Sequence, residues 1–95
     1  MNLPVRIVKL KQEKVDIRTE TRNVSSAGAY FMIEDQEPLP GAPIEFYLTF
    51  PHEKDKTVEL RCRGRVVRVE EVDGETASGV GASIDRYQFV RPRKG

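Results

Sequence analysis

The chain has 95 residues and a mass of 10.8 kDa, which is enough for one domain that folds without disulfides or metals and too little for two. Its composition, 38% hydrophobic and 33% charged, disfavours disorder. Sixteen Lys and Arg against fifteen Asp and Glu give a net charge of +1, which excludes the overall basic field that drives nonspecific nucleic-acid binding.

Cysteine and histidine counts exclude further classes. Cys62 is the only cysteine and His52 the only histidine, so an intramolecular disulfide, a four-cysteine zinc site and a two-histidine metal motif are all ruled out. We interpret His52 as a solvated loop residue and Cys62 as a small buried hydrophobe. No apolar run reaches the length of a membrane span, and the first residues do not resemble a signal peptide. We therefore expect a cytoplasmic protein.

Apolar residues recur with a period of two and are separated by turn residues, whereas no segment keeps a helical spacing for three turns. This pattern predicts an all-β fold, a small six-stranded antiparallel β-barrel with little or no helix. The expected strands cover residues 3–10, 15–22, 29–33, 44–50, 57–70 and 79–84. We expect a single domain over 1–95, with its core at about 3–84 and a short basic tail over 85–95.

The fifth of these segments changes its alternation midway. Val58, Leu60 and Val66 fall on one face, whereas Val67 and Val69 fall on the other, with the arginines. Either a bulge near 64–67 rotates the strand or its far end is covered on both faces. Alternating arginines at 61, 63 and 65 are typical of a solvated outer face or of cross-strand ion pairs.

One small, polar segment, residues 23–28, stands between an amphipathic strand and an apolar one. Asn23 and Ser25 are suited to bonding the backbone of a turn, and Gly28 to a positive φ or to the close passage of another chain. The same residues could instead present carboxamide and hydroxyl groups to a ligand, with Gly28 leaving room for it. Both interpretations stay open on the residues alone.

The sequence resembles the PilZ domain family at several places in order. Asn23, Ser25 and Gly28 match the pattern D or N, x, S, x, x, G, and the segments 39–44, 63–69 and 79–82 are similar to later parts of the family pattern. The resemblance implies a small β-barrel that in many members binds the bacterial second messenger cyclic di-GMP. Such members also carry an R-x-x-x-R motif before the first strand. No such motif precedes Leu3, so we expect the arginine arm to be absent or cut off before Met1.

The resemblance implies a ligand-binding set of Asn23, Ser25 and Gly28, to which we add Arg22 and Arg6 as arginines that could replace the arm. Arginine suits cyclic di-GMP because it bonds phosphate or the guanine Hoogsteen edge with two N–H groups and stacks on the base. The expected function is a cyclic di-GMP receptor and regulatory binding module in bacterial signalling. The alternative is a PilZ-type adaptor that binds no nucleotide and works through protein contacts, related to type IV pili or motility.

Other function classes have less support. A nucleic-acid-binding barrel would rest on the arginine strand and on Tyr30 and Phe31, and the charge of +1 weighs against it. Nothing resembles a nucleophile with its base, a carboxylate pair or a phosphate-binding glycine loop, so we expect no enzyme, no catalytic residue, no cofactor and no metal. The expected partners are cyclic di-GMP and an effector protein or adjoining domain, with no DNA, RNA or membrane span.

Overall fold

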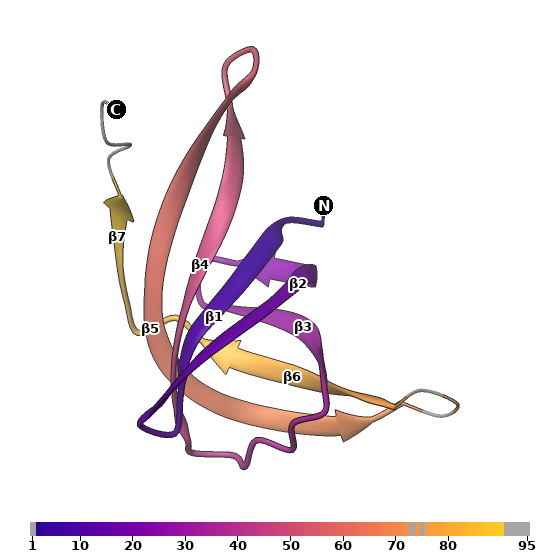
Figure 1. Ribbon diagram of the computed structural model, residues 1–95. Coiled ribbons are helices and arrows are strands. Elements are labelled where there is room, and N and C mark those ends of the chain that lie inside the picture. Colours follow the sequence, from indigo (N-terminus) through magenta and orange to yellow (C-terminus); the bar gives the residue numbers. More distant parts are fainter. Residues whose placement is uncertain (1, 73, 75, 91–95) are drawn as a thin grey trace.

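The computed structural model describes residues 2–72, 74 and 76–90 (Figure 1). These residues form seven strands and no helix, which confirms the all-β prediction. The strands are β1 (Pro4–Leu10), β2 (Glu13–Ser25), β3 (Gly28–Glu34), β4 (Pro43–His52), β5 (Lys56–Glu71), β6 (Ala77–Ser83) and β7 (Arg86–Val90). Within the described part, no helix has the length and hydropathy that a membrane crossing requires.

Six of the strands close a ring, as the sequence predicts. Their order is β4-β1-β2-β3-β6-β5, every neighbouring pair is antiparallel, and pairing of β4 with β5 completes the circle. β7 lies outside this ring and pairs only with β5, so the prediction that residues 85–95 are a tail is wrong for Arg86–Val90. β6 and β7 follow one another along β5, joined by Ile84 and Asp85. Residues 91–95 of the expected tail lie outside the described residues.

The core is built by the inward positions of the alternating strands. Phe31 and Phe46 are fully buried, and their rings meet edge to face with centroids 5.5 Å apart. Cys62 is also fully buried, as predicted, and burial raises the pKa of its thiol to about 11. The thiol therefore acts as a small hydrophobe rather than as a reactive group.

β5 is strongly curved and takes part in two regions of the ring (Figure 1). Its first part pairs with β4 and β7, and its second part pairs with β6. At the bend, a Cβ on Gly64 would overlap the carbonyl oxygen of Ser83, so only glycine permits this approach. The register then shifts between Val66 and Arg68, so the bulge is the alternative observed, and Val67 points outward with 61% of its surface exposed.

The arginines of β5 form cross-strand pairs, one of the two arrangements that the sequence predicts. Glu45 on β4 accepts from Arg61 Nη2 at 3.0 Å and from Arg63 Nε at 2.9 Å. Arg65 instead donates from Nη1 to the carbonyl oxygen of Gly41 at 3.1 Å.

Candidate functional site

The small, polar segment at 23–28 forms the end of the β2–β3 hairpin. Asn23 pairs with Tyr30 and Ser25 with Gly28, so the strands continue through most of the predicted break and leave only a two-residue turn. Pairing with an apolar strand that is itself held by β6 outweighs the weak strand preference of Asn and Ser. Ser25 Oγ accepts the backbone N–H of Ala27 at 3.2 Å, which is the turn-stabilising role considered above.

Gly28 permits a close approach between strands. Its φ is not positive, and a Cβ at this position would lie 2.6 Å from the carbonyl oxygen of Ala82 on β6. Of the two roles predicted for Gly28, a positive φ and the close passage of another segment, the structure shows the second, because β6 passes close to it.

This surface is hollowed into a shallow depression, the motif groove, with a volume of about 590 Å³. Asn23, Ser25 and Gly28 all line it, so the fold brings the three residues of the motif together. The opposite wall comes from the bulge of β5 and from β6, which contribute Val67, Arg68, Gly81, Ala82 and Ser83. Within the described part of the chain, the Asn23 carboxamide has no hydrogen-bond partner, and Asn23 and Ser25 are both exposed.

Tyr30 and Arg68 form a cluster at one end of the groove. The Arg68 guanidinium lies 5.2 Å from the centroid of the Tyr30 ring, within the range of a cation–π contact. Glu70 joins them, because it accepts a hydrogen bond from Tyr30 Oη at 3.1 Å and forms an ion pair with Arg68, whose Nε lies 3.1 Å from the carboxylate. Burial and the hydrogen bond to Glu70 raise the pKa of Tyr30, while the positive charges of Arg68 and Arg22 oppose this. The groove therefore presents an aromatic ring and a guanidinium.

The two candidate arginines lie in different places. Arg22 is exposed at a register shift between Thr21 and Asn23, next to the groove and close enough to Tyr30 for its charge to act on the phenol. Arg6 lies on β1, pairs with Asp16 at 3.2 Å, and lines another depression. The fold thus brings Arg22 to the motif residues but not Arg6.

Sequence reasoning missed Tyr30 and Arg68 as groove residues. The change of alternation after Gly64 was the available signal, since it indicated that the side chains of this part of β5 rotate. What the sequence did not reveal is that β5 and the β2–β3 hairpin lie on either side of β6, because that order depends on the pairing of distant strands. Across the described residues, no group of three or more His, Cys, Asp or Glu side chains is placed to hold a metal ion.

A family model described as PilZ domain matches residues 1–90. The chain belongs to the PilZ domain family. No curated protein and no solved structure gives a match. At the level of the family, a PilZ domain is a cyclic di-GMP-related signalling module or an adaptor rather than an enzyme. The motif groove holds Asn23, Ser25 and Gly28, the residues of the sequence resemblance, together with Tyr30 and Arg68.

Proposed function

We propose that this PilZ domain is a cyclic di-GMP receptor that binds its ligand over the motif groove. The observation that carries the proposal is the shared groove: Asn23, Ser25 and Gly28 line it together with the guanidinium of Arg68. Two neutral polar side chains would hold a dianionic ligand only weakly. An arginine facing them supplies the charge-assisted hydrogen bonds that phosphate or a guanine edge requires.

Arg68 is suited to this role because only part of its hydrogen-bonding capacity is used. Its Nε forms an ion pair with Glu70, and the two terminal nitrogens have no ion pair within the described residues. The side chain is 60% exposed and is steadied by the Tyr30 ring below it. Arg22, at the neighbouring bulge, is the second cation that a ligand over Asn23 would meet.

The start of β1 lies close to the motif groove, which suggests how ligand binding could affect an effector protein. The backbone N–H of Leu3 donates to Thr21 Oγ1 at 2.8 Å, and the N–H of Thr21 donates to the Leu3 carbonyl at 2.8 Å. These bonds hold the start of β1 beside β2, two residues before Asn23. A ligand over the groove would therefore bind close to the start of β1 and change the surface that an effector protein meets.

Isothermal titration with cyclic di-GMP tests the proposal. We expect micromolar or tighter binding, weakened at least about tenfold in Asn23→Ala/Ser25→Ala and in Arg68→Ala, and no comparable binding of cyclic di-AMP. Thr57→Ala/Gln88→Ala, which removes exposed polar groups outside the groove, is the matched control and keeps the affinity. Equal binding by the groove variants and the control would place the ligand elsewhere.

A second candidate function, a PilZ adaptor without nucleotide, is favoured by a different observation. An apolar groove of about 330 Å³ runs between β7 and the β2–β3 hairpin, where Tyr87 is 62% and Phe89 69% exposed. Exposed apolar surface of this kind is typical of protein contacts. A folded chain that gives no heat with cyclic di-GMP at high micromolar concentration would overturn the receptor and favour the adaptor.

A further inference from the structure

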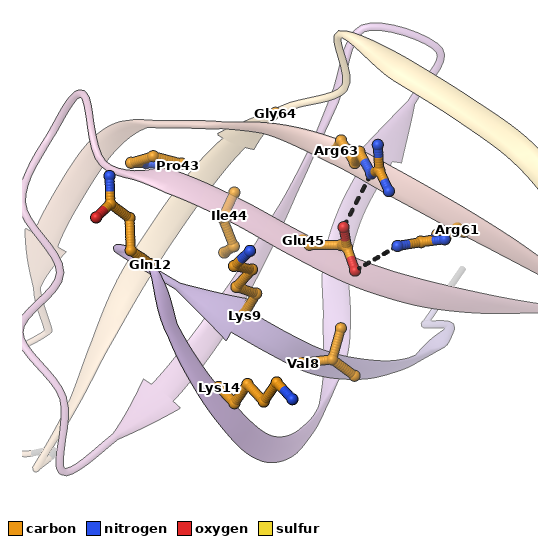
Figure 2. A pocket seen from close by; sticks show the side chains of 10 residues that line it. All are labelled: Val8, Lys9, Gln12, Lys14, Pro43, Ile44, Glu45, Arg61, Arg63 and Gly64. Atoms are coloured by element: carbon orange, nitrogen blue, oxygen red, sulfur yellow. Dashed lines mark hydrogen bonds and ion pairs between the residues drawn. The ribbon is translucent and has the colours of Figure 1, made fainter.

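A second depression, the basic cleft, opens on the outer face of β1, β4 and β5 (Figure 2). It has a volume of about 630 Å³, within the usual range of small-molecule sites. Its polar lining consists of Lys9, Gln12, Lys14, Glu45, Arg61 and Arg63, and it shares no residue with the motif groove. The basic cleft has no part in the cyclic di-GMP binding proposed above.

Strand register concentrates positive charge at this cleft. Going across the sheet, the residues directly opposite one another on β2, β1, β4, β5 and β7 are Lys14, Lys9, Glu45, Arg63 and Arg86. Lys14 faces Lys9 and Arg63 faces Arg86, and like charges directly opposite each other destabilise a sheet. A row with one carboxylate and four cations is unexpected in a chain whose net charge is only +1.

The carboxylate does not neutralise the cleft. Glu45 already bonds both Arg61 and Arg63, as the dashed lines in Figure 2 show, while Lys9 and Lys14 form no ion pair with any described residue. Four cationic side chains against one carboxylate leave three positive charges uncompensated. In addition, Arg61 Nε is buried without an acceptor, and an orphaned buried donor costs free energy.

The β1–β2 turn, which lies between Lys9 and Lys14, has a strained backbone. The β1–β2 turn has positive φ at Lys11 (59°) and Gln12 (109°), a conformation that ordinarily takes Asn and Gly. The Lys11 N–H donates to the Pro43 carbonyl at 3.0 Å and ties the turn to the start of β4. Such backbone strain persists where the surrounding structure enforces it, often at ligand sites. The lysines are thereby held across the cleft from the arginines.

We propose that the basic cleft is a second anion site, which takes a chain of linked phosphates. A single phosphate would satisfy one wall, whereas linked phosphates reach both the lysines of the hairpin and the arginines of β5. Arginine offers paired N–H donors to phosphate, and lysine offers a point charge. Inorganic polyphosphate and the phosphate chain of a nucleoside triphosphate share this chemistry. Cyclic di-GMP does not, because its two phosphates are separate diesters.

Titration of the full chain with inorganic tripolyphosphate tests the proposal, at an ionic strength of about 0.05 M so that screening is moderate. We expect Lys9→Gln/Lys14→Gln to weaken binding at least about tenfold. Lys54→Gln/Lys56→Gln removes the same charge from the β4–β5 connection and the first residue of β5, and should change affinity by less than about twofold. No binding by the unaltered chain, or equal losses in the two double variants, would overturn the site.

Two further titrations, one with another variant and one with another ligand, test the site more specifically. Glu45→Gln removes the only carboxylate of the cleft and should strengthen tripolyphosphate binding by about threefold or more, which a purely structural Glu45 would not do. ATP in place of tripolyphosphate separates the two sources: equal affinity identifies the phosphate chain alone as the ligand, and tighter binding of ATP identifies a nucleotide.

The proposals for the basic cleft and for the motif groove can be tested independently of each other. Asn23→Ala/Ser25→Ala should leave tripolyphosphate binding intact, and Lys9→Gln/Lys14→Gln should leave cyclic di-GMP binding intact. Loss of tripolyphosphate binding in the groove variant would show that the phosphate chain occupies the groove, which would overturn the second site.

Discussion

Individual residues in this protein are constrained mainly by how closely strands approach. Gly64 and Gly81 differ in the space that their surroundings leave for a Cβ atom. At Gly64 a Cβ would collide with backbone, whereas at Gly81 the nearest atom, Arg68 Cβ, would lie 3.5 Å away in ordinary contact. Two glycines of neighbouring strands therefore have different reasons to be glycine, and only the first is required by the bend of β5.

We expect Gly64→Ala to destabilise the fold by about 3 kcal/mol, because the obstacle is the Ser83 carbonyl, which cannot move without opening the barrel. Gly81→Ala should change the free energy of unfolding by less than about 1 kcal/mol. Urea denaturation of the two variants measures both values. Equal effects would show that the bend tolerates a side chain.

Residue-level prediction from sequence succeeded where the pattern itself carried the information. Cys62 falls in phase with Leu60 and Val66, and alternation alone was enough to predict that it is buried. Gly28 shows the limit of such reasoning. A sequence cannot distinguish a glycine needed for positive φ from one needed for close approach, because the second depends on a strand far along the chain.

At the scale of elements, the turns and bulges decide where side chains point. The register shifts after Ile7, after Thr21 and after Val66 each rotate the strand that follows. The last shift exposes Val67 and brings Arg68 to the motif groove. Of these three shifts, only that of β5 was predictable, because it alone breaks a long alternation in the sequence.

The β1–β2 turn offers a test of element-level strain. Replacing Lys11-Gln12 by Asn-Gly supplies residues that accept positive φ at both positions, so we expect stability to rise by about 1 kcal/mol. Gln88→Gly in β7, where φ is not positive, should lower stability instead. Thermal denaturation followed by circular dichroism compares the two. A turn variant no more stable than the unaltered chain would mean that the turn is unstrained.

The extra strand β7 was missed for a similar reason. Tyr87 and Phe89 do alternate with polar residues, but a segment of only five residues is a weak signal for a strand. Its existence depends on the free edge that β5 offers beyond the end of β6. The number of strands that close the ring was predictable, and the strand added outside it was not.

For the whole molecule, closure of the ring is the feature that makes it one cooperative unit. Every ring strand has two neighbours within the ring, and β6 joins β3 to β5. β7 has one neighbour, and its Tyr87 and Phe89 are mostly exposed, so it buries little apolar surface. The order of the strands around the ring, and hence the meeting of Arg68 with Asn23, could not be predicted from local patterns.

A chain ending at Asp85 should therefore keep a single cooperative unfolding transition, with a Tm lower by no more than about 10 °C. A chain ending at Glu71, which lacks β6, should show no cooperative transition, because both β3 and the second part of β5 lose a partner. Differential scanning calorimetry of the two chains measures this. Loss of cooperativity in the first chain would make β7 part of the structural unit.

The late position of β6 also governs how the protein emerges from the ribosome. β3, with Phe31 and Ile33 on its inward face, is synthesised well before the strand that covers its open edge. Until then the nascent chain presents an unpaired apolar edge, the kind of surface on which chains associate wrongly. Pairing of such distant segments is also slow. The same closure that protects the finished barrel thus delays its formation, and leaves a period in synthesis when a holding chaperone has an apolar strand to bind.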